Sequence, residues 1–430
     1  MDYHPVVTSF LISGKQILLL RRSEKVGTHR GLWSAVSGYL EDNEQPLRRA
    51  LTEIHEELAL DEGQVSLIRA GEVVRAYDYE NNTVWVIHPF LFEAKSRAIQ
   101  LDWENIECVW INPNELDSYP TVPKLKEVFD RVRDLQASPA VLSTSLKGVD
   151  DLSRDRIHGA SFLGRQAVEL LSTTCSISKA EDKDELFSEL LLVAQKLRNA
   201  QPGMANVWNL VGIFLHLVDR ERSKAISVSD LKTVSGALGE KIIQASKEAA
   251  EDASRNTAHE FPERGRVLTH SYSSAVLRSL ELGVKSGKSI EVYATESYPG
   301  MEGIQLAQDL IKLGFPVKSI ADSTVDSVIP TVDLVLVGSD SVLSDGALVH
   351  KIGTKHIAAV THSAGVLFRS TCETMKFSVQ DFLGERPKIT EDVFDLTPSE
   401  YISGFTTEFG KVEPCRVGDR IKSMVEHVYP

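Results

Sequence analysis

Cysteine is scarce in this chain, and its few cysteines lie far apart. The four of them form no Cys-x-x-Cys pair: Cys108, Cys175, Cys372 and Cys415. Isolated thiols of this kind favour neither a zinc site nor a disulfide framework. We therefore expect a protein of a reducing compartment, and place it in the cytoplasm.

Long apolar runs and an excess of positive charge are also lacking. No apolar run reaches the length that spans a bilayer, and the opening MDYHPVVTSF does not have the charged-then-apolar layout of a secretory signal. The formal net charge of −14 argues against a general nucleic-acid or membrane-surface binder, although a local basic pocket remains compatible with it. We expect no membrane partner and no direct binding of nucleic acid.

The chain is too long for one typical domain, because it has 430 residues. Apolar periodicity predicts strands at 6–13, 16–20, 72–79, 83–93 and 103–111, with a helix at 122–135. Small and polar residues with a proline predict a linker at 138–150. Beyond it, helical periodicity predicts a helical part over residues 151–262. Short apolar runs at 290–294, 317–321, 334–337 and 366–370 alternate with helices, which predicts a Rossmann-like parallel sheet within residues 263–430.

Carboxylates are crowded into residues 38–60, where a loop enters a predicted helix. Glu53, Glu56 and Glu57 are spaced i, i+3 and i+4, which places them on one helix face. Like charges this close destabilise a helix unless a cation neutralises them, and Mg²⁺ or Mn²⁺ prefers oxygen ligands. A solvated acidic face is the alternative for a charge run alone.

The start of this helix is also predicted from the sequence. Asp42 or Asn43 can act as the N-cap, and Pro46 falls in the first turn, where its missing N–H costs nothing.

The spacing of the whole stretch resembles the Nudix box. Five residues separate Gly38 from Glu44, and seven more lead to TEIHEELAL at residues 52–60. The family pattern is Gly, five residues, Glu, seven residues, then Arg-Glu-aliphatic-any-Glu-Glu-any-Gly-aliphatic. All four of its glutamates are present, while Thr52 replaces the arginine and Ala59 the glycine. The resemblance implies a Nudix α/β/α sandwich over residues 1–137, the first of two domains in a protein of the α/β and α+β classes.

The Nudix resemblance implies hydrolysis of a nucleoside diphosphate linked to another moiety. Glu53, Glu56 and Glu57 would be the metal ligands for Mg²⁺ or Mn²⁺, and Glu53 and Glu57 the catalytic carboxylates. Gly38 is implied on the substrate side, where it lets the loop carbonyl approach the metal. Thr52 cannot make the ion pair of the family's arginine, which predicts slower turnover or looser metal binding.

Arg22, Glu104 and Glu107 of this domain have two interpretations each. Arg22, at the end of a predicted strand, could meet a substrate phosphate or be a solvated strand end. Glu104 or Glu107 could supply another carboxylate or be only a charge at a strand edge. Ala59 should affect only the helix end, where a left-handed cap costs alanine about 1–2 kcal/mol.

Four segments of the second half resemble the translation initiation factor 2B alpha/beta/delta subunit family, which also contains methylthioribose-1-phosphate and ribose-1,5-bisphosphate isomerases. They are RIHGASFLGRQA (156–167), VLTHSYSSAVLRSL (267–280), residues 295–323 and residues 332–358. The resemblance covers residues 151–430 and implies a Rossmann-like domain that forms a homodimer.

The second domain keeps some ligand-site residues of that family and lacks others. Asp340 is kept in Gly-Ser-Asp and is the catalytic candidate, or alternatively caps a turn. Ser271 replaces the isomerases' cysteine, and a hydroxyl is a poor substitute for a thiol without a base. Lys351 could hold a sugar phosphate or be an ordinary exposed lysine. Tyr298 and Gln201 stand where the family has phosphate-binding arginines, so phosphate should bind weakly.

Three functions are compatible with these residues. The first is a metal-dependent Nudix hydrolase of a nucleotide-type molecule, fused to a regulatory or dimerising domain. The second is a sugar-1-phosphate aldose–ketose isomerase, against which Ser271 and Tyr298 argue. The third is a non-enzymatic binding or assembly protein related to the initiation factor subunits, against which the four retained box glutamates argue.

Overall fold

The computed structural model describes residues 2–41, 44–71, 73–78, 82–133, 138–383, 386–389 and 392–428. The chain divides into two compact units, one of residues 1–137 with the short segment 383–385, the other of the remaining residues. Among the described residues, no helix is long and apolar enough to cross a membrane.

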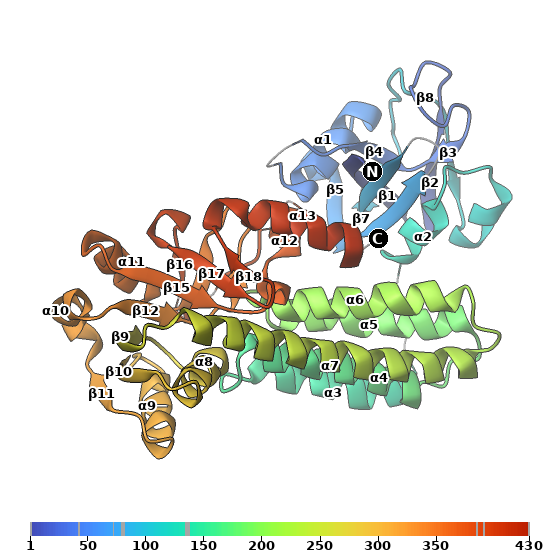
Figure 1. The fold of residues 1–430 in the computed structure, drawn as a ribbon. Helices are drawn as coiled ribbons and strands as arrows, with labels where there is room; N and C mark the ends of the chain where they lie inside the picture. Colours follow the sequence, from blue (N-terminus) through green and yellow to red (C-terminus); the bar gives the residue numbers. More distant parts are fainter. Residues whose placement is uncertain are drawn as a thin grey trace. The chain divides into compact units, whose positions relative to one another are not determined.

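The first unit is built on one mixed sheet of eight strands (Figure 1). Its central path is β3-β2-β1-β7-β5, while β4 pairs with β1, β6 with β7 and β8 with β2. The strands are β1 (Asp2–Ser13), β2 (Gln16–Arg22), β3 (Trp33–Ser34), β4 (Val36–Tyr39), β5 (Val65–Ala70), β6 (Val74–Asp78), β7 (Thr83–Ala94) and β8 (Asn105–Ile111).

Helices cover both faces of this sheet, as a sandwich requires. Alternate residues of β1 face opposite ways, so that Val7 packs in one core with α1 (Pro46–Leu58) and Phe10 in another with α2 (Leu125–Asp130). The predicted helix at 122–135 is wrong in length, because α2 has only six residues. Residues 72, 79–81 and 134–137, on which parts of the hairpin and helix predictions fall, lie outside the described ranges.

The second unit begins with five helices, shown as the green and olive bundle of Figure 1. They are α3 (Pro139–Arg154), α4 (Ala160–Ile177), α5 (Lys183–Ala200), α6 (Ala205–Arg222) and α7 (Val228–Glu260). The linker expected at 138–150 is wrong, because α3 occupies these residues. Val141, Ser145, Val149 and Leu152 are buried at helical spacing. Pro139, read as a breaker, stands in the first turn of the helix, where proline is tolerated.

A seven-stranded sheet follows the bundle, in the order β11-β10-β9-β12-β15-β17-β18. All neighbours are parallel except β17 and β18, so the predicted Rossmann-like sheet is confirmed. Its strands are β9 (Arg264–Thr269), β10 (Ser289–Thr295), β11 (Val317–Ile320), β12 (Leu334–Val337), β15 (Leu367–Thr371), β17 (Gly404–Thr407) and β18 (Gly410–Val412). The helices of this part are α8 (Ser274–Lys285), α9 (Glu302–Lys312), α10 (Val325–Val328), α11 (Thr354–Ser363), α12 (Val379–Phe382) and α13 (Val417–Val428).

A small antiparallel sheet lies beyond the end of β12 and was not predicted. It pairs β13 (Ser341–Val342) with β14 (Leu348–Lys351), and β14 with β16 (Phe394–Thr397). Strand order reverses between β9 and β12, and ligands of doubly wound sheets bind beyond the carboxyl ends of the strands at such a point.

Candidate functional site

Helix α1 carries the box carboxylates and differs from the prediction at its start. The N-cap is Gln45, with Pro46 at the first helical position, while Asp42 and Asn43 lie outside the described residues. At the other end, Ala59 has a left-handed φ of 53°, and its N–H donates to the His55 carbonyl. The expected left-handed cap without glycine is therefore present.

Two of the three clustered glutamates are buried and one is exposed. Glu53 and Glu57 are 6% and 5% exposed, whereas the side chain of Glu56 is 55% exposed. The helix turns Ile54 and Leu58 into the core, which draws the neighbouring Glu53 and Glu57 toward the sheet. The alternative interpretation of this stretch, a fully solvated acidic face, does not describe these two carboxylates.

Both oxygens of Glu57 are held by hydrogen bonds. The backbone N–H of Ser37 donates to Oε1 at 2.9 Å, and Nδ2 of Asn105 donates to Oε2 at 2.7 Å. Burial nevertheless raises the pKa of Glu57 to about 8, because it outweighs these two hydrogen bonds. A cation beside Glu57 would restore its charged form at neutral pH.

Gly38 makes room for Glu53. A Cβ added at position 38 would lie only 1.5 Å from Glu53 Oε1. We predicted that this glycine lets a backbone carbonyl approach the metal. In the structure, the side of Gly38 from which a Cβ would project lies against the Glu53 carboxylate. Any side chain at position 38 would therefore displace that carboxylate.

Arg49, which was not predicted as a site residue, pairs with this cluster. Arg49 Nη2 forms an ion pair with Glu53 Oε1 and lies 3.5 Å from Glu56 Oε2. Burial raises the pKa of Glu53, and Arg49 opposes the rise. Thr52 donates its hydroxyl to the Arg48 carbonyl instead. The i, i+4 spacing of Arg49 and Glu53 was the available signal.

Glu104 and Glu107 have different surroundings in the structure. Glu107 pairs with Arg21 at 3.3 Å on the exposed edge of β2 and β8. Glu104 raises the pKa of both Glu53 and Glu57, so its charge acts on the box. The pKa of Glu104 is raised by burial and lowered in part by Arg22. Arg22 therefore lies near this cluster, with Nε donating to the Thr28 carbonyl at 3.1 Å.

The donor chemistry of the cluster suits a hard divalent cation. Glu53, Glu56, Glu57 and Glu104 interact as like charges, and Arg49 pairs with two of them, Glu53 and Glu56. Within the described residues, no group of three or more His, Cys, Asp or Glu side chains is arranged to hold a metal ion. Glu53, Glu56 and Glu57 therefore lie on one helix without such an arrangement, and their role as metal ligands stays a prediction.

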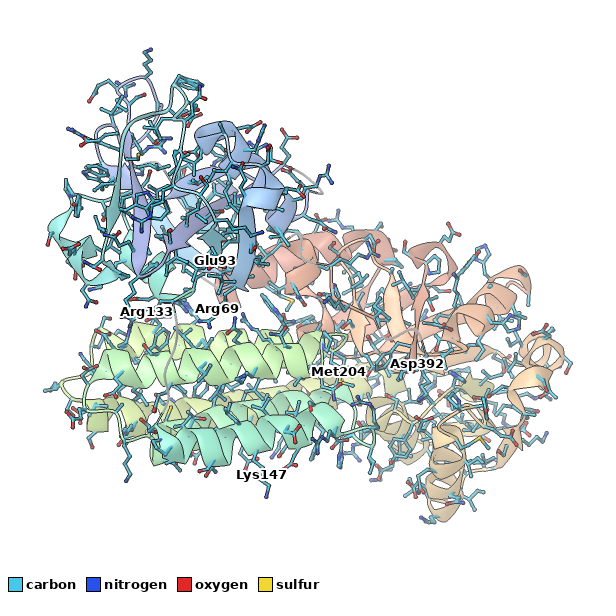
Figure 2. All side chains as sticks on the ribbon, turned by 180° about the vertical axis from the view of Figure 1, so that it is seen from behind. Arg69, Glu93, Arg133, Lys147, Met204 and Asp392 are labelled. Carbon is cyan, nitrogen blue, oxygen red and sulfur yellow. The ribbon has the colours of Figure 1, made fainter. Side chains whose placement is uncertain are left out.

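A second candidate site lies in the second unit, in a cavity of about 390 Å³. Met204, labelled in Figure 2 at the start of α6, is part of its wall. The cavity brings together all three residues predicted for this domain with three others: Asp340, Ser271, Lys351, Arg165, Glu302 and Lys376. These six residues line one cavity, whereas the catalytic role of Asp340 and the substrate-binding roles of Ser271 and Lys351 stay predictions.

The histidine next to Ser271 is not free to act as its base. It adopts a left-handed φ of 64°, and its N–H donates to Ser297 Oγ at 2.6 Å. Neighbouring His270 has Nδ1 2.7 Å from Thr295 Oγ1 and Nε2 2.8 Å from the Ile352 carbonyl, and burial lowers its pKa. Both ring nitrogens are engaged, so His270 is held as a structural hydrogen-bonder.

The cations of the cavity differ in how they are neutralised. Lys351 forms an ion pair with Glu302, and Lys376 Nζ is 3.9 Å from Glu373 Oε2. The Arg165 side chain makes no hydrogen bond or ion pair with any described residue, and burial lowers its pKa. Arg165 and Lys376 were not predicted as site residues, although Arg165 lies in the recognised segment 156–167.

Replacing Asp340 by asparagine should stabilise the protein at neutral pH. Burial raises the Asp340 pKa from 3.8 to about 6, although Lys376 and Lys351 oppose it. A carboxyl group whose pKa is raised on folding stabilises the folded state only while it is protonated. For Asp340 this contribution is complete below about pH 3.8, and it is lost as the pH rises through about 6. Asparagine does not titrate, so at pH 7 Asp340→Asn should gain up to about 3 kcal/mol, or two pKa units. Denaturant unfolding at pH 4 and pH 7 measures this, and an equal difference at both values would contradict it.

The fold and the candidate sites define a two-domain α/β protein, with a carboxylate helix in one domain and a Rossmann-like sheet in the other. Comparison with known proteins agrees with this description of both domains. Residues 156–391, more than half of the chain, match the Initiation factor 2 subunit family, and residues 2–132 match the NUDIX domain. The chain belongs to the Initiation factor 2 subunit family and carries a NUDIX domain before it.

Three relatives illustrate the match of the second domain. Ribose 1,5-bisphosphate isomerase of Methanocaldococcus jannaschii is 28% identical over 60% of this chain and 88% of its own length. A putative translation initiation factor eIF-2B subunit 2-like protein of Pyrococcus furiosus is 29% identical over 63% of this chain and 97% of its own. The crystal structure of Pyrococcus horikoshii translation initiation factor eIF-2B is 25% identical, covers 63% of this chain and 98% of its own, and has a TM-score of 0.54.

Proposed function

We propose that the first domain is a metal-dependent hydrolase of a nucleoside diphosphate linked to another moiety. The observation that carries this proposal is the arrangement of carboxylates on α1. Glu53 and Glu57 are buried against β4, and Glu56, which directly precedes Glu57, is open to solvent. The NUDIX domain match supports hydrolase chemistry in this part of the chain.

Glu53, Glu56 and Glu57 would hold one or more Mg²⁺ or Mn²⁺ ions, which supply positive charge to the pyrophosphate oxygens. Glu53 would accept the proton of the attacking water or orient the group that does. Ser37 and Asn105 hold Glu57 in place through its two oxygens. Arg49 orients Glu53 and Glu56, which is the part that the box arginine plays in the resemblance. Arg22 would meet a phosphate from the strand end.

A panel of ADP-ribose, dinucleotides and nucleotide sugars, with Mg²⁺ or Mn²⁺ and then with a chelator, tests this function. Hydrolysis that depends on the metal and on the box glutamates would support it. Absence of turnover on the whole panel would overturn it.

A second candidate function is the binding of a sugar phosphate by the second domain. The observation that favours it is Arg165, a cationic side chain in the cavity wall that makes no hydrogen bond or ion pair with any described residue, although the charge of Glu373 acts on it. The first turn of α4, at Ala160 and Ser161, lines the same cavity, and helix N-termini attract anions. Because Ser271 replaces the isomerases' cysteine and both ring nitrogens of neighbouring His270 are engaged, we propose binding without isomerisation, in a regulatory role.

Ribose 1,5-bisphosphate should bind the full chain, and Arg165→Ala should weaken that binding about tenfold or more, since charge-assisted hydrogen bonds to phosphate are lost. Isothermal titration measures the affinity. Arg154→Ala, which removes an exposed arginine that pairs with Asp150, is the matched control. Unaltered affinity in Arg165→Ala would contradict the prediction. Conversion of the sugar phosphate that disappears in Asp340→Asn would instead support an isomerase.

Other expectations belong to the same proposal. We propose a homodimer formed through the second domain and a cytoplasmic location. A non-enzymatic role in assembly with initiation factor subunits is the remaining alternative. It would be favoured by co-purification with such subunits in the absence of either activity.

A further inference from the structure

His350, on β14, lines the cavity of the second unit and has no part in the binding proposed above. It is only 4% exposed. Its Nδ1 lies 2.9 Å from Thr354 Oγ1, whereas its Nε2 makes no hydrogen bond with any residue of the described ranges. A Cβ added at Gly338, which also lines the cavity, would lie 3.5 Å from Nε2. A buried polar atom without a partner costs free energy, so Nε2 is a candidate to meet a ligand.

The hydroxyl of Thr354 decides which ring nitrogen of His350 carries the proton. Thr354 Oγ1 lies 2.6 Å from the Lys351 carbonyl oxygen and donates its only proton to it. Towards His350 this hydroxyl must therefore be the acceptor. The ring proton is consequently on Nδ1, and Nε2 presents a lone pair to the cavity.

The imidazole of His350 is neutral in these surroundings. Burial lowers its pKa well below 6.5, and interactions with His270, Lys376 and Lys351 lower it further. A neutral ring with its proton on Nδ1 cannot donate a hydrogen bond from Nε2. At neutral pH, Nε2 is therefore an acceptor only.

The carboxyl group of Asp340 is a second acceptor in the same part of the cavity. The backbone N–H of Asp340 donates to the carbonyl of Val349, the neighbour of His350, at 3.0 Å. Lys376 and Lys351 act on Asp340 as they do on His350, so the two groups share their surroundings. In the part of the chain that the structure describes, the Asp340 carboxyl has no hydrogen bond or ion pair, and it lines the cavity. Two acceptors without donors thus face one space.

Two acceptors side by side favour a ligand that presents two neighbouring donors. Carbonyl and phosphate oxygens only accept, whereas hydroxyl groups can donate to both Asp340 and His350. We propose that His350 Nε2 accepts a hydrogen bond from one hydroxyl of the ligand, while Asp340 accepts from the hydroxyl on the adjacent carbon. The inference rests on the proposed binding of a sugar phosphate, and it makes His350 a residue that selects a ligand with a vicinal diol. The plain alternative is that His350 serves stability alone, through Thr354.

Isothermal titration of the full chain at neutral pH with ribose 5-phosphate, 2-deoxyribose 5-phosphate and 3-deoxyribose 5-phosphate tests this selection. Each deoxy sugar lacks one hydroxyl of the diol, so the wild type should bind it about tenfold more weakly or worse, because a buried acceptor is left without a donor. His350→Phe should bind one deoxy sugar within about twofold of ribose 5-phosphate and keep the loss for the other, which Asp340 recognises. His350→Gln should keep both losses, since its amide oxygen can accept.

A histidine outside the cavity provides the matched control. His356 is exposed on α11 and pairs with Asp326, so His356→Phe should leave all three affinities unchanged. Thermal unfolding checks that each variant is folded, because His350→Phe also loses the hydrogen bond to Thr354. The ratio of two affinities in one variant does not change when only part of the protein is folded, so this ratio reports on the missing hydroxyl and not on stability.

The outcome for His350 is separable from that for sugar-phosphate binding. Equal binding of the three sugars by the wild type, with loss of all three in Arg165→Ala, would overturn the selection of a diol and leave the binding. Both losses unaltered in His350→Phe would overturn the role of His350. Absence of binding of all three sugars would overturn the proposed binding, and the selection with it.

Discussion

Replacing Glu56 and Glu57 together by glutamine is expected to lower metal-dependent hydrolysis at least about a thousandfold. The two residues are carboxylates in the proposed metal set, and neutral amides cannot neutralise a divalent cation as carboxylates do. Loss of one electrostatic group at a reacting centre costs roughly 10²–10³ in turnover. Steady-state rates with Mg²⁺ and Mn²⁺ on the nucleotide panel measure the loss.

The double variant should remain folded, which makes the loss informative. Burial raises the pKa of Glu57 to about 8, so a neutral side chain suits this position. Asn105 Oδ1 is buried without a hydrogen-bond partner, and rotation of that amide would let it accept from the new glutamine. Glu62→Gln, the same change at an exposed residue outside the box, is the matched control. Unchanged hydrolysis in the double variant would overturn the assignment of the site.

Replacing Arg49 by methionine is expected to lower turnover about 10–100-fold and to weaken Mn²⁺ binding. The guanidinium pairs with Glu53 and reaches Glu56, and residues that orient metal ligands are typically worth this much. Thr52→Arg, which restores the box arginine, should raise wild-type turnover by less than about twofold, because Arg49 already makes the pair. Kinetics and titration with Mn²⁺ followed by electron paramagnetic resonance measure both effects.

A rise in Mn²⁺ affinity in Arg49→Met would contradict this expectation. It would mean that the guanidinium competes with the metal for Glu53 and Glu56 rather than orienting them. Arg48→Met is the matched control, because Arg48 is exposed on the same helix and no described ion pair involves its side chain.

The elements that were predicted correctly are those whose formation depends on the local period of helix or strand. The i, i+3, i+4 spacing of the box glutamates and the apolar runs of the parallel strands follow from the periods of helix and strand. The linker at 138–150 failed because Pro139 is a breaker inside a helix and an ordinary residue in its first turn. Only the packing of this segment against α4 and α5 distinguishes the two cases.

The sequence alone determined that carboxylates crowd one helix face and that the isomerases' thiol is replaced by Ser271. It did not determine which cations accompany them. Arg49, Arg165 and Lys376 belong to their sites through side-chain reach and through strands and helices distant in the chain. Glu53 and Glu57 differ from ordinary surface glutamates because folding removes them from water, and that desolvation is a property of the tertiary structure.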